Sequence, residues 1–179
     1  LPLYDYLDSQ NDINGISAQD AVEKFTDWVN SLNDHLPILV MSHVPMHYNR
    51  EDNFGGALWA NALNQAASEH DIFAFWGHNH TMEEKFDNYV DRDYYLTLPG
   101  DILQVQGEET AEEITAEFTY MNAGYLKLGF GTLLTFTDND NDYDYDEVVI
   151  QRYTTEGKQL ENFGNTDYPC PYTFELREW

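Results

Sequence analysis

Two stretches decide the fold: LPILVMSHVPMH, residues 36–47, and IFAFWGHNH, residues 72–80. Each begins as a short continuous apolar run and ends in histidines. Apolar runs of this length without alternation are typical of strands that are buried on both faces, as in parallel sheets. Residues 57–67 between them are rich in helix formers. Residues 36–76 therefore predict a strand–helix–strand unit, whose right-handed crossover makes the two strands parallel.

An amphipathic helix is predicted before the first stretch. Ser17 offers a hydroxyl that can cap a helix, and Asp20 follows three positions later. Apolar residues then recur three and four positions apart, which places one apolar stripe against a core. We expect this helix to run from Ser17 to near Asn33.

The pattern changes beyond residue 90. Residues 114–120 alternate apolar and polar side chains, and residues 126–136 and 147–153 are two further strand-like runs. Such runs predict a mainly antiparallel meander. No internal repeat or Pro/Ser-rich linker divides the chain. We expect an α/β fold in a single domain over residues 1–179, with residues 154–179 peripheral to it.

Composition excludes several classes of partner. The chain has 33 acidic and 8 basic residues and a net charge of −25, which disfavours nonspecific binding to nucleic acid or to anionic membrane surfaces. No apolar run approaches the roughly 18 residues that a membrane span needs. The single cysteine, Cys170, has neither metal-ligand spacing nor a base beside it, and we assign it no role.

Three histidines follow the ends of the two predicted strands: His43, His78 and His80. Ligands bind at the carboxyl ends of strands in open α/β sheets, and Gly77 lets the backbone turn sharply there. Converging imidazoles would form the nitrogen-rich part of a site for zinc, iron or, with carboxylates, manganese. The alternative is that they are hydrogen-bonded or capping histidines; three at two adjacent strand ends favour the metal.

The ordered pair of motifs, Ser-His-Val-Pro-x-His at 42–47 and Gly-His-Asn-His at 77–80, resembles the last two metal-binding motifs of the calcineurin-like metallophosphoesterases. Residues 98–101 and 119–125 are similar to segments of large extracellular bacterial members of that family. The resemblance covers roughly residues 17–153 of the sequence. It implies a β-sandwich with flanking helices and an extracellular or cell-surface location in bacteria.

The resemblance also implies an activity and its cofactors. Family members hydrolyse phosphate esters with a metal-activated hydroxide at a dinuclear site of manganese, iron or zinc ions. By this resemblance, His43 and His78 would bind one metal and His80 the other. The two ions would lie about 3.5–4 Å apart and clamp the phosphate.

The family's remaining motifs are absent from these residues: an Asp-x-His, a Gly-Asp that bridges both metals, and a Gly-Asn-His. Gly100-Asp101 follows the second histidine motif instead of preceding it, so we do not assign it the bridging role. We therefore expect the chain to be the C-terminal portion of a longer phosphoesterase domain. Alone, it should bind one metal ion or none, contain no catalytic residue and be inactive.

Several other positions have two interpretations. His47 and Arg50 lie where a substrate phosphate could meet a cation and hydrogen-bond donors, although a solvated loop is equally consistent with them. For His35 and His70, at the opposite ends of the strands, we expect solvated surface positions without function. Residues 138–146 carry alternate carboxylates like a calcium loop but lack its glycine and glutamate, which favours a solvated hairpin.

Two further expectations concern the whole chain. A half-domain would expose sheet that its missing half normally covers, and such a surface tends to pair, which predicts a homodimer or other assembly. The rival to an enzyme is a non-catalytic extracellular binding or structural module with relic histidines, because the acidic composition would suit a calcium-rich setting.

Overall fold

The structure is a computed structural model. It describes residues 18–42, 45–47, 55–77, 96–106, 111–125, 130–140, 145–154, 156–161, 163 and 168–178. Within these ranges the chain forms the following helices and strands: α1 (Ala18–Val29), β1 (Ile38–Ser42), α2 (Gly56–Ala66), β2 (Ile72–Trp76), β3 (Leu96–Thr97), β4 (Ile102–Gln106), β5 (Ala111–Thr115), β6 (Thr119–Asn122), β7 (Gly124–Tyr125), β8 (Phe130–Thr137), β9 (Glu147–Thr154) and β10 (Tyr172–Glu175).

The first sheet has the order β1-β2-β6-β3. Strands β1 and β2 are parallel, β2 and β6 are parallel, and β3 is antiparallel to β6. The predicted parallel strand–helix–strand unit is therefore confirmed, with α2 as its helix. The alternating run at residues 114–120 is not one strand, because β5 pairs with β4 in a hairpin while β6 pairs with β2 in the first sheet.

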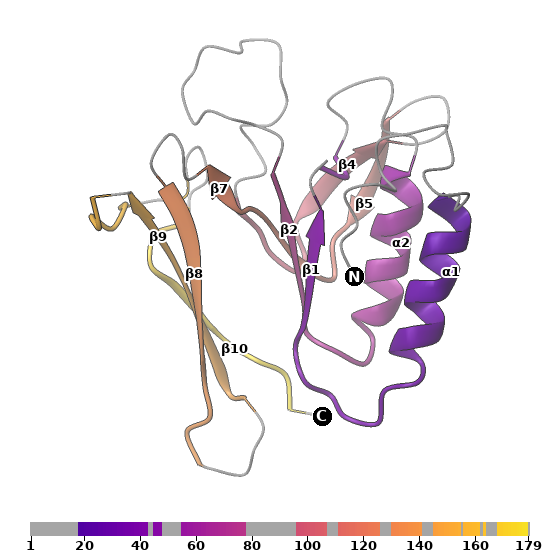
Figure 1. The fold of residues 1–179 in the computed structure, drawn as a ribbon, viewed down its shortest axis with the longest axis horizontal. Helices are drawn as coiled ribbons and strands as arrows, with labels where there is room; N and C mark the ends of the chain where they lie inside the picture. Colours follow the sequence, from indigo (N-terminus) through magenta and orange to yellow (C-terminus); the bar gives the residue numbers. More distant parts are fainter. Residues whose placement is uncertain are drawn as a thin grey trace.

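The two helices cover one face of the first sheet (Figure 1). Helix α1 buries residues four positions apart (Ala21, Phe25 and Val29), as its apolar stripe predicts. The ring of Phe25 lies 5.6 Å from that of Trp59 on α2. The helix ends at Val29, earlier than expected, because Ser31 bonds the carbonyl of Trp28 through both its backbone N–H and its hydroxyl.

The second sheet, with the order β10-β9-β8-β7, is antiparallel throughout and lies across the other face of the first (Figure 1). Between the sheets, the ring of Phe73 on β2 lies 5.4 Å from that of Phe136 and 5.8 Å from that of Phe174. The mainly antiparallel second half is thus confirmed, and the fold is α/β with two packed sheets and helices on one side.

Residues 154–179 are not peripheral, contrary to our expectation. Strand β10 pairs with β9 along its length, and Phe163, Cys170 and Leu176 are buried in the core between the sheets. Cys170 accepts a 3.2 Å hydrogen bond at Sγ from the backbone N–H of Arg152. Burial raises the pKa of the Cys170 thiol, because the thiolate would lose its hydration.

Strand β1 is the edge of the first sheet within the described part of the chain. Its residues Ile38 and Val40 are buried, whereas Leu39 is 51% exposed and Met41 is 61% exposed. Leu39 and Met41 are register partners of Phe73 and Phe75 on β2, which the second sheet covers. The apolar face between the sheets therefore continues onto β1 without the same cover.

Candidate metal-binding edge

The carboxyl ends of three parallel strands meet at one edge of the first sheet. Ser42, the last residue of β1, pairs with Trp76, the last residue of β2, and Trp76 pairs with Asn122, the last residue of β6. Neighbouring strands lie about 4.8 Å apart. The chain therefore leaves β1 and β2 side by side at this edge, which we call the carboxyl edge.

The predicted metal ligands follow directly from this edge in sequence. His43 comes one residue after Ser42, and His78 and His80 come two and four residues after Trp76. All three lie outside the residues that the structure describes, as does Arg50. Their roles as ligands and as a substrate contact stay predictions, while the position of the strands that precede the three histidines is established.

His47 is fully buried at the carboxyl edge. Its Nδ1 shares a 3.0 Å hydrogen bond with the hydroxyl of Tyr120, on β6. Its ring meets that of Trp76 edge-on at 4.8 Å, and its backbone forms a bridge with Val105 on β4. The solvated-loop alternative is therefore wrong for this side chain, and its contact with a substrate stays a prediction.

Tyr120 connects the segment after β1 to the rest of the sheet. Its hydroxyl accepts a 2.8 Å hydrogen bond from the backbone N–H of Met46. Its ring stacks on Trp76 at 6.2 Å with an angle of 29° between the planes. Tyr120 is itself buried, so the segment 45–47 is tied to β6 by hydrogen bonds within the core, where they are protected from competition with water.

A buried arginine lies behind the same edge. Arg152 on β9 is fully buried, and its guanidinium donates to the carbonyl of Asn122 and, at 3.3 Å, to the hydroxyl of Thr132. It also lies 5.5 Å from the ring centroid of Phe163, a cation–π contact. The burial of Arg152 was not predicted from the sequence. The period-two pattern of β9 was the available signal, since Arg152 lies on the face of Val148 and Ile150.

The opposite, amino edge of the sheet carries the other two described histidines. His70 is buried, contrary to the expected solvated position, and its Nδ1 lies 3.3 Å from the carbonyl oxygen of Leu36. His35 is exposed, with Nδ1 2.9 Å from the carbonyl oxygen of Glu69. Arg177 donates to the carbonyls of Ala67 and His70, each at 2.5 Å, and its Nε pairs with Asp71 at 2.8 Å.

Asp101, which imitates the family's bridging aspartate in sequence, has a local structural role. Its carboxylate accepts hydrogen bonds from the backbone N–H of Leu98 at 2.8 Å and from the hydroxyl of Tyr168. The preceding Gly100 has a φ of 97°, a backbone conformation that favours glycine. Asp101 therefore stabilises a turn, in agreement with our decision not to assign it the bridging role.

One group of three acidic side chains could hold an ion among the residues that the structure describes: Asp138, Asp140 and Asp146, whose ligand atoms lie within 4.8 Å of one another. The backbone N–H of Asn139 donates to Asp146 at 2.5 Å. All three are at least partly exposed, as a solvated hairpin predicts. The hairpin lies at the far end of the molecule from the carboxyl edge (Figure 1), so these carboxylates cannot complete a site there.

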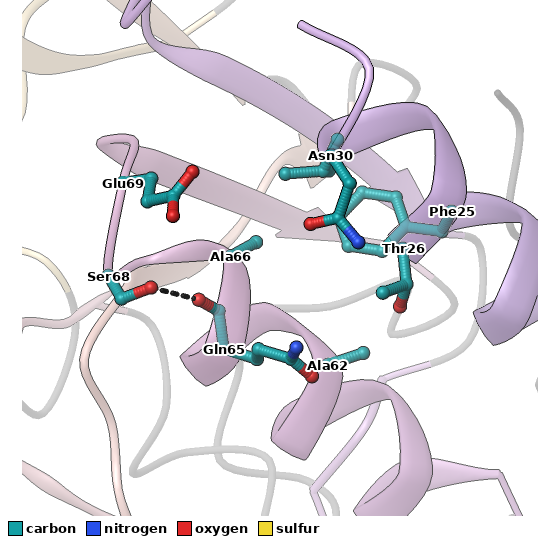
Figure 2. A pocket seen from close by; sticks show the side chains of 9 residues that line it. Phe25, Thr26, Asn30, Ala62, Gln65, Ala66, Ser68 and Glu69 are labelled. Atoms are coloured by element: carbon teal, nitrogen blue, oxygen red, sulfur yellow. Dashed lines mark hydrogen bonds between the residues drawn. The ribbon is translucent and has the colours of Figure 1, made fainter.

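A small pocket lies between α1 and α2 and the turn after α2 (Figure 2). Its volume is about 60 Å³, room for about two water molecules. Phe25, Ala62, Asn30, Gln65 and Glu69 are among the residues that line it, and the hydroxyl of Ser68 donates to the carbonyl of Gln65 at 2.7 Å.

Among the described residues, no helix has the length and apolar character required to cross a membrane. Comparisons of the chain with models of known protein families, with curated proteins and with solved structures gave no match.

Proposed function

We propose that this chain is the C-terminal portion of a metal-dependent phosphoester hydrolase of the calcineurin-like type. The observation that carries the proposal is the parallel register of Ser42 with Trp76, which brings the two histidine-bearing strand ends to one edge. His43, His78 and His80 would supply the nitrogen ligands of the metals. The resemblance described above supplies the reaction class.

The residues near the edge have separate tasks in this proposal. Two divalent ions would supply a hydroxide near neutral pH and offset the charge of the phosphate. The imidazoles of His43, His78 and His80 would hold these ions as neutral ligands. The strands before them fix where the ligands begin, since β1 and β2 are hydrogen-bonded along five register pairs. Carboxylate ligands would come from other residues of the intact polypeptide.

The exposed face of β1 supports the proposal that further strands belong to the same domain. Leu39 and Met41 present a continuous apolar surface on an edge strand that has no charged residue and no proline within it. Natural edge strands are normally protected by such residues. A strand of this composition suits a position inside a larger sheet, next to further strands of the same domain; a second copy of the chain is the alternative cover.

The charge balance supports the choice of substrate and location. A net charge of −25 would repel a polyanion, so a phosphate ester must be drawn in by bound cations and not by the protein surface. A small ester would meet less repulsion than nucleic acid. The composition and the family resemblance together favour an extracellular or cell-surface setting.

The test uses the intact polypeptide that contains this chain. We expect hydrolysis of p-nitrophenyl phosphate or its diester that depends on added Mn²⁺, and a loss of kcat/KM of more than about 100-fold in His43→Ala or His78→Ala. His35→Ala is the matched control, because His35 is an exposed histidine at the amino edge. Unchanged activity in both ligand variants would refute the proposal, and a parent without phosphatase activity would favour the non-catalytic module.

A further inference from the structure

The pocket in Figure 2 has an apolar part to which both helices contribute. Its apolar lining residues are all buried: Phe25 and Val29 of α1, and Ala62 and Ala66 of α2. The polar residues that line it are at least partly exposed. One surface opening therefore offers an apolar wall and a polar rim, which together suit a side chain with a hydrocarbon stem and a polar end.

The polar rim carries a negative charge and several hydrogen-bond acceptors. Glu69 supplies the charge, and within the described residues its carboxylate forms no ion pair. The hydroxyl of Ser68 donates to the carbonyl of Gln65 at 2.7 Å, which leaves the lone pairs of its oxygen to accept a bond. In Figure 2 the carboxylate of Glu69 and the side-chain amides of Asn30 and Gln65 lie around the pocket. These groups match a ligand that is both a cation and a hydrogen-bond donor.

The ends of both helices add to the negative potential of the pocket. Val29 is the last residue of α1 and Ala66 is the last residue of α2, and both line the pocket. The C-terminus of a helix carries a partial negative charge that favours cations, yet neither helix has a basic residue in its last turn. Arg177 donates to the carbonyl of Ala67, but it does not line the pocket and its charge is paired with Asp71.

The size of the pocket decides which cation it can hold. A volume of about 60 Å³ suits an ammonium group with one or two carbon atoms better than a planar guanidinium. A free amine of about three non-hydrogen atoms would bind with a Kd no tighter than about 0.5 mM, even at the highest binding energy observed per atom. Tighter binding requires contacts outside the pocket, so the ammonium group must belong to a larger partner.

The surface of α1 beside the pocket provides such contacts for a basic partner. The helix has three acidic residues and one lysine. Two of the acidic residues, Glu23 and Asp27, are exposed and each precede a lining residue, Thr26 or Asn30, by three positions, so they are its neighbours on the helix surface. The net charge of −25 would also speed the approach of a basic partner.

We propose that this pocket receives the ammonium group of a lysine side chain from a basic partner protein. Glu69 is the counter-ion, and the oxygens of Gln65 and Ser68 accept the remaining N–H groups. The methylene stem of the lysine packs on Phe25 and Ala62. Further basic residues of the partner lie along the acidic face of α1. This inference is independent of the proposed hydrolase function.

The experiment measures the binding of fluorescein-labelled hexalysine to the intact polypeptide by fluorescence anisotropy, at a fixed low salt concentration because salt screens exposed charges. We expect Glu69→Gln to weaken binding by about threefold to fivefold, the range for a partly exposed ion pair. Glu156→Gln is the matched control, since it removes the same charge from an exposed turn after β9, and it should leave the affinity unchanged.

A second variant tests the pocket without a change of charge. Thr26→Phe adds a ring to the lining of a small pocket, and we expect it to weaken hexalysine binding by about fivefold, whereas Thr26→Ser should bind as the wild type does. Hexaarginine carries the same charge in larger head groups, so Thr26→Phe should not affect its binding.

Several results would overturn the inference. Equal losses in Glu69→Gln and Glu156→Gln, or a wild type that does not bind hexalysine, would show that net charge alone acts. Wild-type affinity in both Glu69→Gln and Thr26→Phe, or equal effects of Thr26→Phe on the two peptides, would show that no lysine enters the pocket. Ethylamine should displace hexalysine in the millimolar range; displacement at micromolar concentrations would assign the pocket to a free amine instead of a partner protein.

Discussion

The two edges of the first sheet differ in the balance between contacts to the backbone and contacts between side chains. At the amino edge, His35, His70 and Arg177 bond to backbone carbonyls, including that of Ala67 just after α2. Helix ends leave carbonyls that need donors, so these side chains complete the backbone hydrogen bonding of the connections. The amino edge is therefore stabilised mainly by hydrogen bonds from side chains to the backbone carbonyls of the connecting segments.

At the carboxyl edge, alongside bonds to the backbone of Met46 and Asn122, several contacts join side chains to one another. His47, Trp76 and Tyr120 come from three segments far apart in sequence and meet through rings and one hydroxyl. Contacts of this kind depend on the shape of each partner, whereas a backbone carbonyl is present whatever residue carries it. The residue types at the carboxyl edge are therefore constrained by the shapes of the side chains that they contact.

The largest effect should come from the two arginines, one behind each edge. Arg152→Met leaves the buried carbonyl of Asn122 and the hydroxyl of Thr132 without their charged donor, and we expect a loss of about 3 kcal/mol in the free energy of unfolding. Arg177→Met removes a partly exposed ion pair and should cost about 1 kcal/mol. Urea denaturation of the 179-residue chain measures both.

Equal losses of unfolding free energy in the two arginine variants would contradict the expected difference between the edges. They would show that a partly exposed contact to carbonyls contributes as much as a buried one. Thr132→Val provides a further control for the carboxyl edge. It removes one of the described partners of Arg152 while conserving the volume of the side chain. The free energy of unfolding should therefore fall by less than half of the loss expected for Arg152→Met.

A second, intermediate effect should come from the hydroxyl of Tyr120. Tyr120→Phe leaves the buried N–H of Met46 without its acceptor and removes the bond to His47, which should cost about 2 kcal/mol. At the amino edge, His35→Ala removes one bond to an exposed segment and should change stability by no more than about 0.5 kcal/mol. Thermal unfolding followed by circular dichroism compares the two; a smaller loss for Tyr120→Phe would contradict the assignment of a buried network.

The sequence predicted the parallel strands of the first sheet well and the rest of the fold unevenly. Continuous apolar runs can be assigned to buried strands, and the crossover rule then sets their direction, which is why the parallel pairing of β1 with β2 could be predicted. Alternation is a local property and does not identify the partner strand. The alternating run at 114–120 therefore gave no sign that β5 and β6 belong to different sheets. The three metal ligands themselves lie outside the described residues.

Burial from distant segments explains the remaining differences. His70 is buried among groups that include the carbonyl of Leu36, and its own carbonyl accepts from Arg177; neither contact follows from the residues beside it. The segment 154–179 has few continuous apolar runs, yet β10 completes a sheet through its pairing with β9. Arg152 is charged, and a charged residue is not expected on the buried face of a strand, where the structure places it. In each case tertiary packing overrides a local signal.

The smallest effect concerns Cys170, which reports on the carboxyl edge because its Sγ accepts the N–H of Arg152. Burial raises the pKa of its thiol above the ordinary value of 9.0. The unfolded chain therefore loses this proton at a lower pH than the folded chain does, so the contribution of Cys170 to stability is present below pH 9.0 and falls as the pH rises above it. We expect Cys170→Ala to flatten this decline slightly. We also expect the native thiol to react with a disulfide reagent at pH 8 more than about tenfold more slowly than in urea, since access requires local opening; a native rate equal to the rate in urea would show that the segment around Cys170 opens freely.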